Sequence, residues 1–91
     1  MKIKQGFVKR KIKDKYIVVA TGQARKDYRG FIELNNNSSL IWDYIAIGKT
    51  AEEIANEFVK EFNVDFDTAL ADVNEIISIL KKEGVICEWK L

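Results

Sequence analysis

The stretch FIELNNNSSLIWDYIAIGKTAEEIA, residues 31–55, decides the fold expected for this chain. Its first four residues, 31–34, read as a short strand, which three asparagines end abruptly. Apolar side chains then recur at helical spacing, which predicts a helix over about 38–47 with Asn37 or Ser38 as its cap. The chain is therefore expected to leave a sheet at residue 34 and to enter a helix soon afterwards.

Two more helices are predicted downstream. Thr50 and Glu53 have the spacing of a capping box, in which each side chain satisfies a backbone amide of the other residue, so a helix is expected over about 51–62. Another is expected over about 66–83, with Asp65 as its cap. The inward stripe of the first of these helices is expected to contain Ile54, Ala55, Phe58, Val59 and Phe62.

The N-terminal third of the chain is expected to supply the rest of the sheet. Residues 7–12 and 16–21 are rich in β-branched and aromatic side chains, which is typical of strands. A polar connection over 22–30 leads to the strand at 31–34, and the simplest arrangement is an antiparallel meander. The final apolar segment, 85–87, can form a short strand or an extended tail on the core. The sequence therefore predicts an α+β, winged-helix-like fold, with a three-stranded antiparallel sheet followed by three helices.

Composition limits the chemistry of the chain. Its 91 residues are expected to form one domain, 1–91. There is no histidine and one cysteine, Cys87, which argues against a zinc site and against Ser-His or Cys-His nucleophile pairs. No Gly-rich phosphate loop occurs. We therefore expect no enzymatic activity, no metal and no cofactor.

The N-terminus, the apolar runs and the cysteine count indicate a location for the protein, and the charges indicate what it can contact. The N-terminus lacks the apolar stretch of a signal peptide, and no apolar run is long enough to span a bilayer. A single cysteine suits a reducing compartment, so a cytoplasmic location is expected. The net charge is +1, but residues 1–30 carry +8 and residues 31–91 carry −7. These halves can be solvated faces that pack together, or the basic half can meet an acidic partner.

The two outer strands of the expected sheet differ in how well they are protected. Natural edge strands usually carry charges, because unpaired amides and carbonyls recruit other strands. The strand at 7–12 contains three charged residues, Lys9, Arg10 and Lys11. The strand at 31–34 contains one charged residue, Glu33. The second strand therefore has an open edge, which the protein's own tail, a second copy or a guest peptide can cover.

The helix over 66–83 is expected to form the second wall of a groove beside this edge. On a helical wheel, Asp72, Glu75 and Ile79 fall on one flank of its apolar stripe, and Leu70 and Ile77 fall on the other. The helix is thus apolar over a wider arc than one core-facing stripe. These residues can all serve the core, or one flank can face a groove.

The order of these elements resembles a known family. The run YIVVATG…FIELNNNSSLIWDYIAIGKTAEEIANEFVKEFNVD…ALADVNEIISILKKEGVI is similar to PqqD-like proteins, named after the coenzyme PQQ synthesis protein D, over about residues 7–87. Members are also called RiPP recognition elements, where RiPP denotes a ribosomally synthesised, post-translationally modified peptide. The chain departs from the usual pattern at 36–38 and at Ala20, and neither departure is expected to touch the groove.

The resemblance implies a function in natural product biosynthesis such as PQQ biosynthesis. Such proteins are non-catalytic peptide chaperones that bind a leader peptide as an added strand and present the precursor to a modifying enzyme, often a radical SAM maturase. Carried onto this chain, the peptide-binding residues are Arg29, Phe31, Ile32, Glu33, Leu34, Asp72, Glu75, Ile76 and Ile79. Arg25 and Lys26 can add electrostatic contacts with acidic leader residues, or they can be solvated loop charges.

Two other functions compete with this interpretation. A winged-helix DNA-binding regulator is the alternative, because fold does not fix function. Its reading helix would be the one at 66–83. This helix and its cap carry several acidic residues against only two lysines, whereas a helix facing phosphates should have the opposite balance. The acidic residues include Asp65, Asp67, Asp72 and Glu75, and the lysines are Lys81 and Lys82. Nucleic acid is therefore not expected as a partner. A membrane is not expected either, because no apolar run is long enough to span one. A homodimer can also form through the open strand, where it would compete with a peptide.

Overall fold

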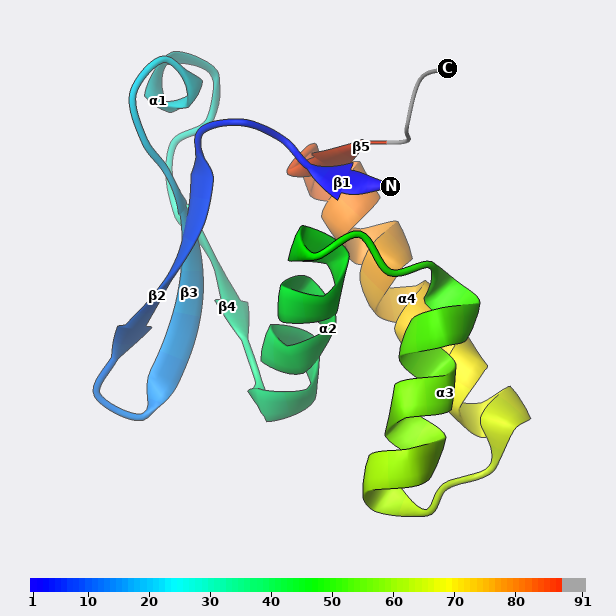
Figure 1. The fold of residues 1–91 in the computed structure, drawn as a ribbon. Coiled ribbons are helices and arrows are strands. Elements are labelled where there is room, and N and C mark those ends of the chain that lie inside the picture. The colour runs from blue at the N-terminus through cyan, green and yellow to red at the C-terminus, as the bar shows by residue number, and fades with distance from the viewer. Residues whose placement is uncertain (88–91) are drawn as a thin grey trace.

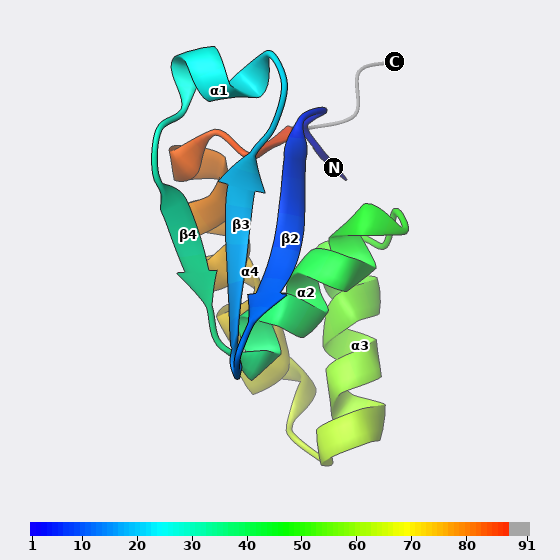
Figure 2. The same ribbon diagram turned by 90° about the vertical axis from the view of Figure 1, so that its left-hand side faces the viewer.

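The computed structural model describes residues 1–87 and contains the expected three-stranded antiparallel sheet. Its strands are β2 (Phe7–Ile12), β3 (Lys15–Ala20) and β4 (Phe31–Leu34), in the order β2-β3-β4. Helices cover one face of this sheet (Figure 1), and the other face is open, with β4 at one margin (Figure 2). The predicted α+β, winged-helix-like fold is confirmed. The connection expected to be irregular contains a one-turn helix, α1 (Ala24–Asp27).

The three long helices lie close to their predicted positions. They are α2 (Asn36–Ala46), α3 (Ala51–Phe62) and α4 (Phe66–Glu83). The predicted cap of α2 is wrong, because Oδ1 of Asn35 accepts a hydrogen bond from the Ser38 amide at 2.8 Å and the helix begins at once after it. A single residue therefore separates β4 from α2.

A second, two-stranded sheet joins the two ends of the described chain. Strand β1 (Lys2–Ile3) pairs with β5 (Ile86–Cys87) in antiparallel fashion. The segment at 85–87 thus contains a strand, whereas β1 was not expected from the sequence. Because β5 pairs with β1, it does not cover β4.

The core lies between the inner face of the large sheet and the helices. Val18 and Leu34 point inward from β3 and β4 and are at most 5% exposed. They join one cluster with buried side chains of all three long helices, which include Ile41, Ile45, Ile54, Val73, Ile77 and Leu80. Ile77 of α4 is therefore a core residue. None of the helices within residues 1–87 is long and apolar enough to cross a membrane.

Lys9 does not act as the exposed edge charge that the sequence suggested. It lies opposite Val18 in the β2–β3 register, so its side chain points to the inner face and is only 17% exposed. Its Nζ donates to Ser39 Oγ at 2.6 Å and contacts Asp43 Oδ1 at 2.8 Å. It also lies 4.9 Å from the centre of the Tyr16 ring. Lys9 thus ties β2 to α2.

We expect Lys9→Ala to lower the free energy of unfolding by about 1–2 kcal/mol, because it removes a charged donor from the buried Ser39 hydroxyl. Lys11→Ala is the matched control, since Lys11 lies on the same strand and face but is exposed. Chemical denaturation of both variants measures the difference. An equal cost for the two substitutions would show that the inward contacts of Lys9 contribute nothing.

The capping box of α3 makes one stability contribution depend on pH. Glu53 Oε1 accepts from the Thr50 amide at 2.8 Å, and Thr50 Oγ1 accepts from the Glu53 amide at 3.2 Å. Hydrogen bonds from the backbone and hydroxyl of Thr50 hold the pKa of Glu53 below its usual value. This contribution is therefore present above the ordinary carboxyl pKa and is lost as the pH falls through the lowered pKa.

We expect Glu53→Gln to be less stable than the wild type at pH 7, and the difference to shrink on acidification. Urea denaturation of both proteins over a pH series measures it. Glu52→Gln serves as the control, because Glu52 is an exposed neighbour outside the capping box. A gap between wild type and Glu53→Gln that stays constant down to low pH would contradict this role of the carboxylate.

Candidate peptide-binding site

The candidate site begins at the free edge of β4. Within residues 1–87, β4 pairs on one side with β3, through the register Tyr16↔Leu34 to Val19↔Phe31, and no strand pairs with its other side. Backbone amides and carbonyls on that side are therefore available to another strand. This arrangement is the open edge that the sequence indicated.

The four side chains of β4 divide between the two faces of the sheet. Phe31 is 62% exposed on the outer face, and Glu33 on the same face forms an ion pair with Lys15 at 3.3 Å. Ile32 is half-buried on the inner face, and Leu34 is 5% exposed within the core. The side chain of Leu34 is thus not available to a guest, and this residue can offer only its backbone.

A cavity of about 270 Å³ lies at the C-terminal end of β4. It brings together three of the sequence-predicted residues, Asp72, Glu75 and Ile76, although Asp72 and Glu75 themselves are exposed. Asn35, Asn37, Ser38, Ile41, Phe58, Phe62, Val64, Thr68 and Ala69 complete its lining. Two residues of the departure from the family pattern at 36–38, Asn37 and Ser38, therefore line this cavity.

Phe62 and Val64 are lining residues that the sequence interpretation missed. Phe62 was assigned to the inward stripe of α3, but as its last residue it is 45% exposed, and its ring packs edge-to-face on Phe58 at 5.4 Å. Val64, in the turn that follows, is 38% exposed. The sequence signal that could have indicated them is their position, because one large apolar residue stands at the end of the expected helix and another just beyond it, where exposed apolar surface can form.

Further along α4, side chains of the same turn differ sharply in burial, because they lie on different faces of the helix. Ile77 is 6% exposed, whereas Ile79 is 46% exposed and Ile76 is half-buried. Leu70, on the same flank as Ile77, also packs against the core. The flank of α4 with Asp72, Glu75 and Ile79 is thus the one that core packing leaves accessible.

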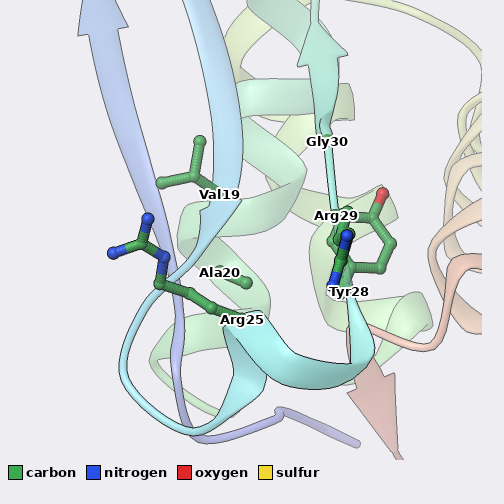
Figure 3. Close-up of a pocket in the computed structure, with 6 residues that line it drawn as sticks. All are labelled: Val19, Ala20, Arg25, Tyr28, Arg29 and Gly30. Atoms are coloured by element: carbon green, nitrogen blue, oxygen red, sulfur yellow. The ribbon is translucent and has the colours of Figure 1, made fainter.

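A second cleft, of about 540 Å³, lies at the N-terminal end of β4, where β3 and β4 part (Figure 3). Arg25 approaches it from α1, and Arg29 stands on the opposite wall, just before the strand. Val19, Ala20, Tyr28 and Gly30 complete the lining. Lys26 does not line this cleft. Ala20, the other departure from the family pattern, therefore also lies in a cleft at one end of β4.

Tyr28 fastens this end of the site to the rest of the molecule. Its hydroxyl donates to Glu83 Oε1 at 3.0 Å, and its ring meets Phe7 edge-to-face at 5.5 Å. Burial raises the pKa of the Tyr28 hydroxyl, and the Glu83 carboxylate raises it further, so the hydroxyl stays protonated and donates. The segment that carries Arg29 is thus held against the C-terminal end of α4.

The chemistry of the described residues is that of a binding surface. In residues 1–87, no group of three or more His, Cys, Asp or Glu side chains could hold a metal ion. Cys87 is a free, half-buried thiol on β5. The features that remain at the site are backbone groups of β4, apolar side chains of α3 and α4, and charges at the two ends of the strand.

This combination defines an α+β protein of winged-helix-like form with an unpaired edge strand. The family model described as coenzyme PQQ synthesis protein D (PqqD) matches residues 15–86, so the chain belongs to the PqqD family. The matched region begins at β3, later than the residue 7 expected from the sequence.

Comparison with solved structures confirms the fold. The structure described as TbiB1 in complex with the TbiA(beta) leader peptide has a TM-score of 0.80 and 24% sequence identity, and the similarity covers 100% of both chains. At that identity the likeness shows the fold. A search of curated proteins found no match.

The contrast between Ile77 and Ile79 can be measured directly. We expect Ile77→Ala to lower the free energy of unfolding by about 2–4 kcal/mol, because it leaves a hole in the core. Ile79→Ala should cost no more than about 1 kcal/mol, because that side chain is largely in water. Denaturant unfolding of the two variants gives both values. A cost for Ile79→Ala as large as that for Ile77→Ala would place Ile79 in the core and remove it from the site.

Proposed function

We propose that this protein is a non-catalytic adaptor, a single domain over residues 1–91, that binds the leader segment of a ribosomally made precursor peptide. The leader adds itself as a strand to β4, with α4 as the second wall of the groove. The observation that carries this proposal is the unpaired edge of β4 beside a flank of α4 that core packing leaves accessible. Membership of the PqqD family supports it.

Each part of the site has its own role in this proposal. The backbone of Phe31, Ile32, Glu33 and Leu34 exchanges hydrogen bonds with the leader, because an edge strand offers half of its amides and carbonyls outward. Ile76 and Ile79 contact its inward side chains. Arg25, Lys26, Arg29, Asp72 and Glu75 contribute charge at the ends of the strand.

The bound leader would be presented to a modifying enzyme, such as a radical SAM maturase, in the cytoplasm. The family name points to PQQ biosynthesis or a related peptide-derived product. The adaptor itself needs no cofactor for this task, because strand addition and side-chain contacts supply the whole interaction. The outer face of the sheet stays uncovered when a leader occupies β4, and it carries the exposed side chains of Val8, Ile12 and Phe31.

The structure does not favour the DNA-binding alternative. The exposed side chains of α4 include Asp67, Asp72 and Glu75 along its first three turns, where a reading helix would meet phosphates. A second copy that paired through β4 would occupy the same edge as the leader. Homodimer formation and leader binding would therefore exclude each other at this strand.

The proposal is tested by titrating the isotope-labelled protein with the N-terminal halves of candidate precursors, chosen from short reading frames near its gene. We expect amide NMR shifts concentrated in residues 29–34 and in α4, because these segments form the two walls. Shifts confined to β2, or none at saturating peptide, would count against it.

A matched pair of substitutions separates the groove from general effects of charge. Ile79→Glu should weaken leader binding by about tenfold or more, since it places a carboxylate where an apolar contact is proposed. Ser78→Glu adds the same charge one residue away, beside Asn74 and Lys81, and should change the affinity by less than about twofold. Isothermal titration calorimetry gives both dissociation constants, and equal losses would contradict the proposed groove.

A further inference from the structure

We propose that the β4 edge selects its guest by charge polarity: a peptide with basic residues toward its N-terminal end and acidic residues toward its C-terminal end. This inference rests on the proposed function and adds to it the chemistry and the direction of the guest. Its basis is that cavities of opposite charge lie at the two ends of one edge strand.

The charges at the two ends are not neutralised within the described part of the chain. No carboxylate of residues 1–87 lies within ion-pair distance of the guanidinium groups of Arg25 or Arg29, and no lysine or arginine of residues 1–87 pairs with Asp72 or Glu75. All four side chains are exposed. By contrast, Glu33, in the middle of the strand, is already paired with Lys15. The charges open to a guest therefore stand at the ends of β4 and not at its centre.

The length of β4 sets the length of a guest peptide that can contact the charged residues at both ends of the strand. Four residues of strand span about 13 Å. A guest with one or two further residues at each end would reach Arg29 at one end and the cavity beside Asn35 at the other, so a segment of about six to eight residues suffices. Its C-terminal part would lie beside Arg29 and Gly30 if it runs opposite to β4, and its N-terminal part would lie beside Asn35, Asp72 and Glu75.

The direction follows from the sheet. Strands β2, β3 and β4 are antiparallel throughout, and antiparallel pairing is slightly more stable per residue than parallel pairing. A guest that continues this pattern places its C-terminal end beside Arg29, whereas Arg25 lies across the cleft, on the β3 side (Figure 3). Exposed charges contribute little affinity individually, about two- to fivefold each, but like charges brought together oppose the wrong direction or register. The four charges thus act mainly on orientation.

A displayed library of randomised 14-residue peptides tests this inference without knowledge of the natural leader. It is selected against the wild type and against a quadruple variant, Arg25→Glu, Arg29→Glu, Asp72→Lys and Glu75→Lys. That variant keeps the net charge of the chain, since two basic and two acidic side chains are exchanged. Ile79→Glu is the filter: only sequences that lose at least tenfold in binding to it are counted as occupants of the β4 groove.

We expect filtered peptides from the wild type to have an excess of Lys and Arg in their first half and of Asp and Glu in their second half. The quadruple variant should invert this bias. The single-end variants, Arg29→Glu and Glu75→Lys, should each remove the bias at one end only. They replace the quadruple variant in this test if circular dichroism shows that the quadruple variant is unfolded.

Two failures are distinguishable. If no peptide passes the Ile79→Glu filter, the β4 groove binds no strand, and the proposed function falls together with this inference. If peptides pass the filter but show no charge bias, a reversed bias, or a bias unchanged in the variants, the groove binds strands and the inference alone is overturned.

Discussion

The direct junction between β4 and α2 is the constraint on which the rest of the structure depends. Leu34 is buried in the core, and the next residue, Asn35, already caps the helix. The chain therefore turns from strand to helix within one residue. The segment that follows β4 does not run back along its unpaired edge. Since β5 pairs with β1, neither end of the described chain closes that edge. The free edge of β4 is thus a consequence of how the core is built.

The two edge strands of the sheet differ in accessibility because they face different neighbours. At β2, a lysine turns inward and its ammonium group binds the buried Ser39 hydroxyl, so this strand is fastened to α2. At β4, the flank of α4 that core packing leaves accessible carries Ile79 and two carboxylates, Asp72 and Glu75, and the carboxylates share a cavity with Asn35 at the end of the strand. One margin is therefore packed against its helix, and the other is left accessible between two charged cavities.

Features set by local hydrogen bonds could be predicted from the sequence, and features set by distant contacts could not. The Thr50–Glu53 box and the Asp65 cap lie within a few residues of the helix ends that they fix. Each of the three adjacent asparagines is a suitable cap by residue type, so residue type does not decide among them, and the structure uses Asn35, next to the buried Leu34. The pairing of β1 with β5 joins two-residue strands from opposite ends of the chain, and neither strand has a local signal. For the candidate site, the open edge of β4 could be predicted, because it follows from which strand carries few charges, whereas the exposure of Phe62 depends on where α3 ends.

The shortness of β4 explains why the ends of the strand matter. A four-residue edge offers about four outward hydrogen bonds to a guest. At a net value of about 1 kcal/mol each, they supply about 4 kcal/mol, which corresponds to a dissociation constant of about 1 mM before the cost of ordering the peptide. Short edge strands resist indiscriminate pairing for the same reason. A specific guest must therefore gain its remaining affinity from side chains. The cavity lined by Phe58, Phe62 and two carboxylates, and the cleft between Arg25 and Arg29, can supply such contacts at the two ends of the strand.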